Sequence, residues 1–164
     1  MTKLKAVLTV GVSASGKTTW ATDFVSSSDD HWVNINRDDL RAMVYESMHP
    51  TQKFSWRTWR WAWEDDVTAA QVEKINLAAE HKHNIIISDT NLNPKIRDRM
   101  IALLESVGYE VELKFFEVTL EEAIRRDAAR ANSVGADVIT KQFKQWSEID
   151  ESHSPINSYE GYYL

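Results

Sequence analysis

A glycine-rich segment near the N-terminus combines residue types that bind phosphate groups. The segment GVSASGKTTW, residues 11–20, matches the pattern G-x-x-x-x-G-K-T with Gly11, Gly16, Lys17 and Thr18. Glycines let the backbone curl so that consecutive N–H groups point at phosphate oxygens, and the start of a following helix adds partial positive charge. Lys17 would reach the β- and γ-phosphates, and the Thr18 hydroxyl would ligate Mg²⁺. The pattern predicts a site for a nucleoside triphosphate and Mg²⁺, and a coincidental glycine-rich turn is the alternative.

Two charged residues that follow the second predicted strand could recognise an acceptor. The segment NINRDDLR, residues 34–41, contains Asp38 and, three residues later on the same face of a helix, Arg41. Ligands of open α/β sheets bind at the carboxyl ends of the strands, where this segment would lie. Asp38 could accept a hydroxyl proton and Arg41 could hold an anion, which indicates a substrate with a hydroxyl and a phosphate. In the alternative interpretation, Asp38 or Asp39 caps the helix and Arg41 is a solvated surface charge.

Two further segments carry charges that fit phosphoryl transfer. Asp89 ends the apolar run NIIISD, residues 84–89, and is a candidate for assisting the metal or orienting the substrate; an ordinary turn aspartate is the alternative. In EEAIRRDAAR, Arg126 and Arg130 lie on one face of a helix, where arginines of a mobile element could stabilise the transferring group. Pairing of Glu122 with Arg126 for helix stability alone is the alternative interpretation.

The elements that must position these residues alternate between strands and helices. The predicted strands are 4–10, 32–36, 84–89 and 110–118, and the predicted helices are 17–25, 38–48, 52–83, 94–107, 120–131 and 137–149. Asn93 before Pro94 marks one helix start, and Thr119 with Glu122 predicts a capping box at another. This order predicts one α/β domain over residues 1–164, with a mostly parallel sheet of four to five strands flanked by helices.

An aromatic segment, FSWRTWRWAW at residues 54–63, allows two interpretations. On a helix, Trp56, Trp59 and Trp63 share one face, with charged residues on another. They could form a platform on which nucleobases stack, or they could belong to the core or to a subunit interface. Trp61 lies off this face and is expected to be exposed.

The composition of the chain argues against several classes of protein and of binding site. The chain has a net charge of −6 and no cysteine, which argues against general coating of nucleic acid and excludes disulfides and thiolate metal sites. MTKLKAVLTV lacks the long apolar region of a signal peptide, so we expect a strand there, no association with membranes and a cytoplasmic location. The tail 151–164, with Tyr159, Tyr162 and Tyr163, could be a docked arm or an added edge strand.

The motifs together resemble a known family. GVSASGKTTW, NINRDDLR and ISDTNLNP, in this order and at these separations, are similar to the kinase domain of the phage 5′-polynucleotide kinase family, in the adenylate-kinase-like group of P-loop kinases. The similarity extends through RRDAARA and covers most of the chain. It implies a P-loop kinase fold with a helical lid at about 120–140, and transfer of the γ-phosphate of ATP to the 5′-hydroxyl of DNA or RNA, an activity of nucleic-acid repair. A phage-encoded protein would act in the host cytoplasm.

The resemblance also implies roles for the matched residues in binding the phosphate donor and in catalysis. Lys17 and Thr18 handle the phosphates and Mg²⁺, and Asp38 is the general base. Arg130, supported by Arg126, is the lid arginine on the donor phosphates. The other candidate nucleotide-binding residues are Gly11, Ser13, Ser15, Gly16 and Thr19.

For the acceptor, the resemblance implies that Arg41 holds the 3′-phosphate and that Asp89 orders this side of the site. The other candidate substrate-binding residues are Arg37, Thr90 and Asn91. No DxDGT-type motif is present, so we expect no 3′-phosphatase activity. A small-molecule or nucleotide kinase of the same fold, and a non-catalytic module that binds nucleic-acid ends in response to ATP, are the alternatives. The sequence leaves homo-oligomerisation and the choice between DNA and RNA open.

Overall fold

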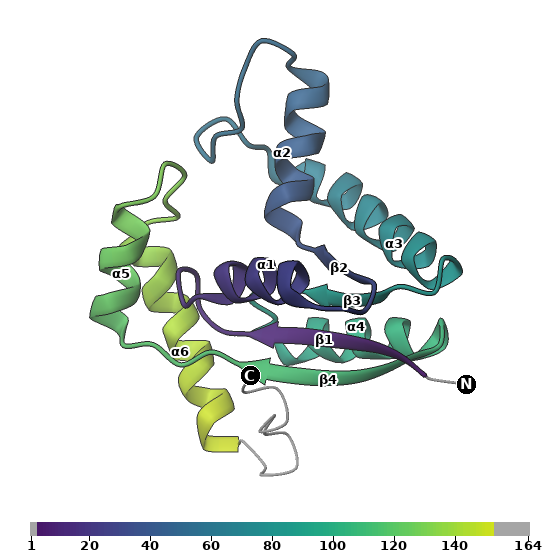
Figure 1. Cartoon of the computed structure of the whole chain (residues 1–164). Coiled ribbons are helices and arrows are strands. Elements are labelled where there is room, and N and C mark those ends of the chain that lie inside the picture. The colour runs from purple at the N-terminus through teal and green to yellow at the C-terminus, as the bar shows by residue number, and fades with distance from the viewer. Residues whose placement is uncertain (1–2, 153–164) are drawn as a thin grey trace.

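The computed structural model describes residues 3–152, and its framework is one parallel sheet of four strands (Figure 1). The strands are β1 (Leu4–Val10), β2 (Trp32–Ile35), β3 (Asn84–Ile87) and β4 (Tyr109–Phe115), in the order β2–β3–β1–β4. The apolar sequences of β1 and β3 suit strands that are buried on both faces. The predicted α/β fold with a parallel sheet is confirmed, although β3 and β4 each end before the residue that the sequence suggested.

Helices connect the strands, and short polar side chains fix where several of them begin. The described helices are α1 (Lys17–Ser27), α2 (Arg37–Met48), α3 (Glu64–Glu80), α4 (Pro94–Ser106), α5 (Leu120–Ala128) and α6 (Ala136–Ser152). Asn36 caps α2, because its side chain accepts a hydrogen bond from the Asp39 N–H. Asn93 caps α4 as predicted. Thr119 accepts from the Glu122 N–H at the start of α5, which forms one half of the expected capping box.

The two faces of the sheet bury alternate residues of each strand. Val7 and Ile86 pack with Ala21 of α1. Their neighbours Leu8 and Ile87 belong to a larger cluster that includes side chains of α3 and α4. Since successive side chains of a strand point to opposite faces, α1 covers one face and α3 and α4 cover the other.

The prediction of one helix over residues 52–83 is wrong in its first part. Residues 52–60 are irregular, Trp61–Trp63 form a short 3-10 helix, and α3 begins only at Glu64. Ser55 turns the chain, since its carbonyl accepts hydrogen bonds from the N–H groups of Thr58 and Trp59. The aromatic rings of this segment pack onto Tyr45 and onto each other, and this packing stabilises an irregular conformation in place of a helix. The three tryptophans therefore do not share one helical face.

Because all four strands run in parallel, their carboxyl ends meet at one edge of the sheet, where the glycine-rich loop and the starts of α1 and α2 lie (Figure 1). The helices α5 and α6 pack on each other beside that edge (Figure 1). None of the helices within residues 3–152 has the length and apolarity needed to cross a membrane. The two interpretations of the tyrosine-containing tail concern residues that lie outside this range.

Candidate active site

A cavity of about 950 Å³ opens at the carboxyl ends of the strands and brings most of the predicted site residues together. Those that line it are Ser13, Gly16, Lys17, Thr18, Thr19, Arg37, Asp38, Arg41, Asp89, Thr90, Arg126 and Arg130. Its wall has two parts: the P-loop side, built by residues 11–19, and the α2 side, built by Arg37, Asp38 and Arg41 with their partners. Segments far apart in the sequence thus line one cavity.

The P-loop side has the backbone shape of a phosphate cradle. Ala14 and Gly16 adopt left-handed conformations with φ of 63° and 104°, so the loop curls directly into the start of α1. Gly16 precedes α1 and offers no side chain to cap it. The first N–H groups of α1 therefore face the loop without a capping side chain, which suits an anion. A Cβ at Gly11 would lie 2.8 Å from Ser15 Oγ and 3.0 Å from the Phe116 carbonyl oxygen, so this position has room only for glycine.

Lys17 lies inside this loop and is almost fully buried. Its Nζ donates to the Val12 carbonyl oxygen at 2.6 Å and to Ser15 Oγ at 3.3 Å. Burial lowers the pKa of Lys17 to about 8, with the nearby carboxylates of Asp38 and Asp89 acting in the opposite direction. An anion bound in the loop would offset the cost of this desolvation, because it favours the charged form of Lys17. The exposed Thr18 hydroxyl, on the same wall, is the group suited to Mg²⁺.

The helices α5 and α6 contact the P-loop side directly. Arg126 donates to the Ala14 carbonyl oxygen at 3.3 Å and also pairs with Glu122 at 3.0 Å, so the pairing considered as an alternative is present. The Ser13 N–H donates to Gln142 Oε1 of α6 at 2.8 Å. Gln142 could not be predicted from the sequence, because a lone glutamine on a helix belongs to no motif.

Asp127 fixes the turn between α5 and α6. Its carboxylate accepts from the N–H groups of Val134 and Gly135, each at 3.0 Å, and from Arg130 at 2.9 Å. Burial alone would raise the pKa of Asp127, but these three donors outweigh it and hold the pKa below its usual value. The position of the Arg130 side chain therefore depends on Asp127, another residue that motif reasoning missed.

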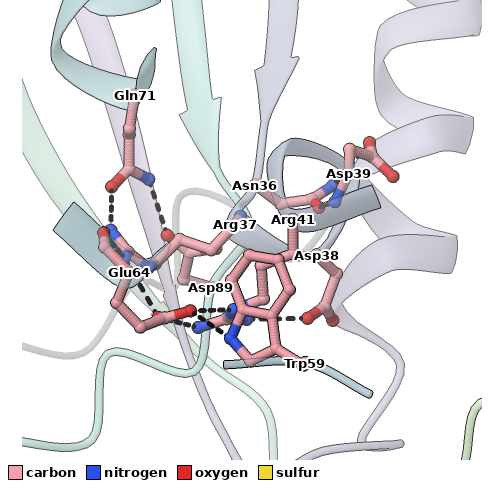
Figure 2. A network of polar contacts seen from close by, with 9 residues as sticks. All are labelled: Asn36, Arg37, Asp38, Asp39, Arg41, Trp59, Glu64, Gln71 and Asp89. Atoms are coloured by element: carbon pink, nitrogen blue, oxygen red, sulfur yellow. Dashed lines mark hydrogen bonds and ion pairs between the residues drawn. The ribbon is translucent and has the colours of Figure 1, made fainter. Parts of the chain in front are cut away.

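On the α2 side, Arg41 is held between two carboxylates (Figure 2). It donates through Nε and Nη2 to the two oxygens of Glu64 at 2.9 and 2.8 Å, and through Nη1 to Asp38 Oδ1 at 2.9 Å. Its side chain is only 16% exposed, so the interpretation of Arg41 as a surface charge is wrong. The alternative that Asp38 or Asp39 caps α2 is also wrong, because Asn36 does so.

Glu64 is the centre of this network, as Figure 2 shows. Besides Arg41, it accepts from Arg37 Nη2 at 3.2 Å and from the indole Nε1 of Trp59 at 3.0 Å. Burial by itself would raise the pKa of Glu64, but Arg41 and Arg37 hold it below its usual value. Glu64 is the first residue of α3 and was not predicted as a site residue, since nothing near it in the sequence indicates its two arginine partners.

Asp89 joins the end of β3 to the start of α2. It accepts from the Arg37 N–H at 2.7 Å and from the Gln71 side-chain amide at 2.8 Å (Figure 2). Gln71 also accepts from Arg37 Nη1 at 3.2 Å. Burial raises the pKa of Asp89, whereas these hydrogen bonds act to lower it. Arg37 thus uses its side chain to join α2 to α3, while its backbone is bound to Asp89.

Three predicted site residues do not line the cavity. Gly11 and Ser15 shape the P-loop from behind: the Gly11 N–H donates to the Thr90 carbonyl oxygen, and Ser15 Oγ accepts from Lys17. Asn91 is buried, and its amide donates to the Thr9 carbonyl oxygen at 2.8 Å. The expected contact of Asn91 with substrate is therefore corrected to a role in joining the loop after β3 to β1.

The aromatic segment contributes two of its tryptophans to the cavity. Trp56 and Trp61 line the wall beside Arg41. Trp59 is buried in the core, and Trp63 is partly buried against it. Trp61 is 71% exposed, as predicted.

Known proteins share the sequence pattern and the fold of this chain. Residues 7–151 match the family described as an AAA domain. The chain belongs to this AAA domain family. It is also 28% identical over 155 residues to a putative bifunctional polynucleotide kinase/RNA ligase of Autographa californica nuclear polyhedrosis virus. The aligned region covers 90% of this chain and 22% of the relative.

Solved structures share the fold. A chain of the Pnkp1/Rnl/Hen1 RNA repair complex superposes with a TM-score of 0.75 at 23% identity, covering 94% of this chain and 47% of that one. A gluconokinase from Sinorhizobium meliloti 1021 superposes with a TM-score of 0.55 at 12% identity, covering 96% of this chain and 82% of that one. This chain spans about a fifth of the viral relative and about half of the repair-complex chain. The resemblance to the kinase part of polynucleotide kinases is confirmed, and the P-loop kinase fold implies binding of ATP.

Proposed function

We propose that this protein is a polynucleotide kinase that transfers the γ-phosphate of ATP to the 5′-hydroxyl end of DNA or RNA. The observation that carries the proposal is the presence of Lys17 and the Asp38–Arg41 ion pair in one cavity. A phosphate donor on the P-loop side and a hydroxyl with an adjacent phosphate on the α2 side would face each other there. The viral relative, named as a polynucleotide kinase/RNA ligase, supports this choice of acceptor.

Arg41 is suited to hold an anion of the acceptor beside Asp38. A guanidinium has five N–H groups, and the bonds to Glu64 and Asp38 use one each on Nε, Nη1 and Nη2. One N–H on Nη1 and one on Nη2 have no partner among residues 3–152. We assign these two donors to the phosphate that follows the 5′-terminal nucleoside.

The proposed reaction uses the chain's own residues to place charges and to move one proton. When bound, Mg²⁺–ATP would supply the phosphoryl group to the 5′-oxygen and leave as ADP, and Thr18 is the residue that would hold the ion. Asp38 accepts the proton of the 5′-hydroxyl on Oδ2, since Oδ1 is held by Arg41. Lys17 and Arg130, with Arg126, neutralise charge on the donor phosphates.

We further propose that these 164 residues have no 3′-phosphatase activity, because they contain no DxDGT-type motif. A release assay for inorganic phosphate from a 3′-phosphorylated oligonucleotide tests this point separately from the kinase reaction.

The test of the kinase proposal is to incubate the protein with γ-labelled ATP, Mg²⁺ and one acceptor at a time. The acceptors are a 5′-hydroxyl oligodeoxynucleotide, the corresponding oligoribonucleotide, and a panel of nucleosides, nucleoside 3′-phosphates and sugars. We expect label in at least one oligonucleotide and none in an oligonucleotide that already carries a 5′-phosphate. Label in small molecules alone would show a metabolite kinase instead. The absence of label in every acceptor, with ATP bound, would indicate the non-catalytic module.

A further inference from the structure

Trp56 and Trp61 form an aromatic surface at the acceptor end of the cavity. Their rings are stacked with centroids 6.0 Å apart and an interplanar angle of 30°. Both line the cavity wall. The segment that carries them is the loop between α2 and α3, coloured blue in Figure 1 beyond the end of α2.

The exposure of Trp61 distinguishes it from its aromatic neighbours. Trp59 is 7% exposed, and Trp63 packs against Tyr45 and Trp59. These two rings hold the segment on the core. Trp61 is 71% exposed and is not part of either core cluster, so its large apolar ring adds little to folding. An exposed tryptophan in the wall of a cavity is instead suited to contact a ligand.

Arg41 lies between this aromatic surface and Asp38, the proposed general base. Its guanidinium carbon lies 5.1 Å from the centroid of the Trp56 ring, while its Nη1 contacts Asp38. The contacts therefore run in the order Asp38, Arg41, Trp56 and Trp61. A polynucleotide whose 5′-hydroxyl reaches Asp38 and whose first phosphate lies at Arg41 would carry its second nucleobase toward the two rings.

We propose that Trp61, with the Trp56 ring packed against it, stacks the second nucleobase of the acceptor, so that the enzyme takes polynucleotide ends whose first two nucleotides are unpaired. This inference rests on the proposed function and specifies its substrate. Stacking uses the face of the base, so the surface accepts all four bases. A nucleobase that is paired within a duplex has both faces covered by its neighbours and has to leave the stack before it can bind here.

The test uses Trp61→Ala, because the exposed side chain can be removed without disturbing the core. The acceptors are a 5′-hydroxyl oligonucleotide and two copies of it with an abasic residue at position one or position two. For the intact oligonucleotide, we expect Trp61→Ala to raise both the KM for phosphorylation and the Kd from fluorescence anisotropy by about 5- to 150-fold, the equivalent of 1–3 kcal/mol. With position two abasic, the wild type and Trp61→Ala should bind alike.

Two further variants separate stacking from a general loss of structure. Trp61→Phe keeps an aromatic ring and should retain most of the affinity. Ile96→Ala removes another exposed apolar side chain, on α4 and outside the cavity, and should change neither constant. Thermal unfolding followed by circular dichroism checks that every variant is folded.

The outcomes distinguish this inference from the proposed function. An equal loss for Trp61→Ala with all three oligonucleotides, or no loss with any of them, would overturn the stacking. A loss that disappears only when position one is abasic would overturn the assignment to the second base. If the wild type bound these oligonucleotides and showed the expected dependence on Trp61 without phosphorylating them, the kinase proposal would fail and the stacking surface would stand.

Discussion

The P-loop side and the α2 side of the cavity face each other but are built by different means. The P-loop side consists of residues 11–19, and its shape comes mainly from the backbone: a tight glycine, two left-handed residues and the start of α1. The α2 side is held by side chains from the loop after β3 and from α2 and α3, joined through Glu64, Gln71 and Asp89 (Figure 2). A phosphate cradle can therefore be made by one short segment, whereas the α2 side needs the folded chain.

Replacement of Asp38 by asparagine is the strongest test of the contribution of the α2 side to catalysis. We expect Asp38→Asn to lower kcat by about 10²- to 10⁴-fold, because the amide cannot accept the hydroxyl proton. The Kd for ATP, measured by isothermal titration calorimetry, should stay the same, since the P-loop side is unchanged.

The matched control is Asp39→Asn, the same change one residue along. Asp39 accepts from the Asn36 side chain at 3.0 Å and does not line the cavity. Turnover by Asp39→Asn should equal that of the wild type. Equal losses in the two variants would show that the charge of α2, rather than the Asp38 carboxylate, matters.

Replacement of Glu64 tests whether the α2 side depends on α3. Glu64→Gln leaves Arg37 and Arg41 beside a neutral partner, so we expect the free energy of unfolding in urea at pH 7 to fall by about 1–3 kcal/mol. The KM for the oligonucleotide should also rise, because Arg41 loses its anchor. Asp65→Asn, an exposed neighbour in the first turn of α3, is the control and should have little effect.

The stabilising effect of Glu64 should also depend on pH in a defined direction. Its pKa in the folded protein lies below the value of 4.5 of an unperturbed glutamate, so the folded state binds the proton less readily than the unfolded state. The contribution is fully present above about pH 4.5 and is lost as the pH falls toward the lower folded-state pKa. The stability difference between wild type and Glu64→Gln should therefore shrink below pH 4.5, and a difference that grew on acidification would contradict the role of the carboxylate charge.

The smallest expected effect concerns the P-loop side alone. The pKa of Lys17 is about 8, and phosphate oxygens favour its protonated form, so ATP binding takes up a proton above that pH. The Kd for ATP at constant Mg²⁺ should therefore rise about tenfold between pH 7 and pH 9. Lys17→Arg stays charged over this range and should give a flat profile. A wild-type profile as flat as that of the arginine variant would mean that Lys17 does not titrate there.

The contrast between the two sides also explains what the sequence could predict. The P-loop side follows from one contiguous motif, and the parallel sheet follows from the alternation of apolar runs with capped helices. Glu64 and Gln71 escaped prediction because their partners lie on α2 and after β3, which only the fold brings near. The helix expected from residue 52 failed because aromatic packing on Tyr45 outweighed the local helical pattern.

The hydrogen bond between the Ser13 N–H and Gln142 Oε1 links the P-loop to α6 across 129 positions of the sequence. A phosphate oxygen that accepts from this N–H must first displace the glutamine amide. Under the proposed function, nucleotide affinity and the position of α6 are therefore coupled thermodynamically, and the coupling is reciprocal. A change that moves Gln142 away from Ser13 would strengthen nucleotide binding by a certain factor. Nucleotide binding would favour release of the glutamine by the same factor, so this one hydrogen bond couples the P-loop to α6.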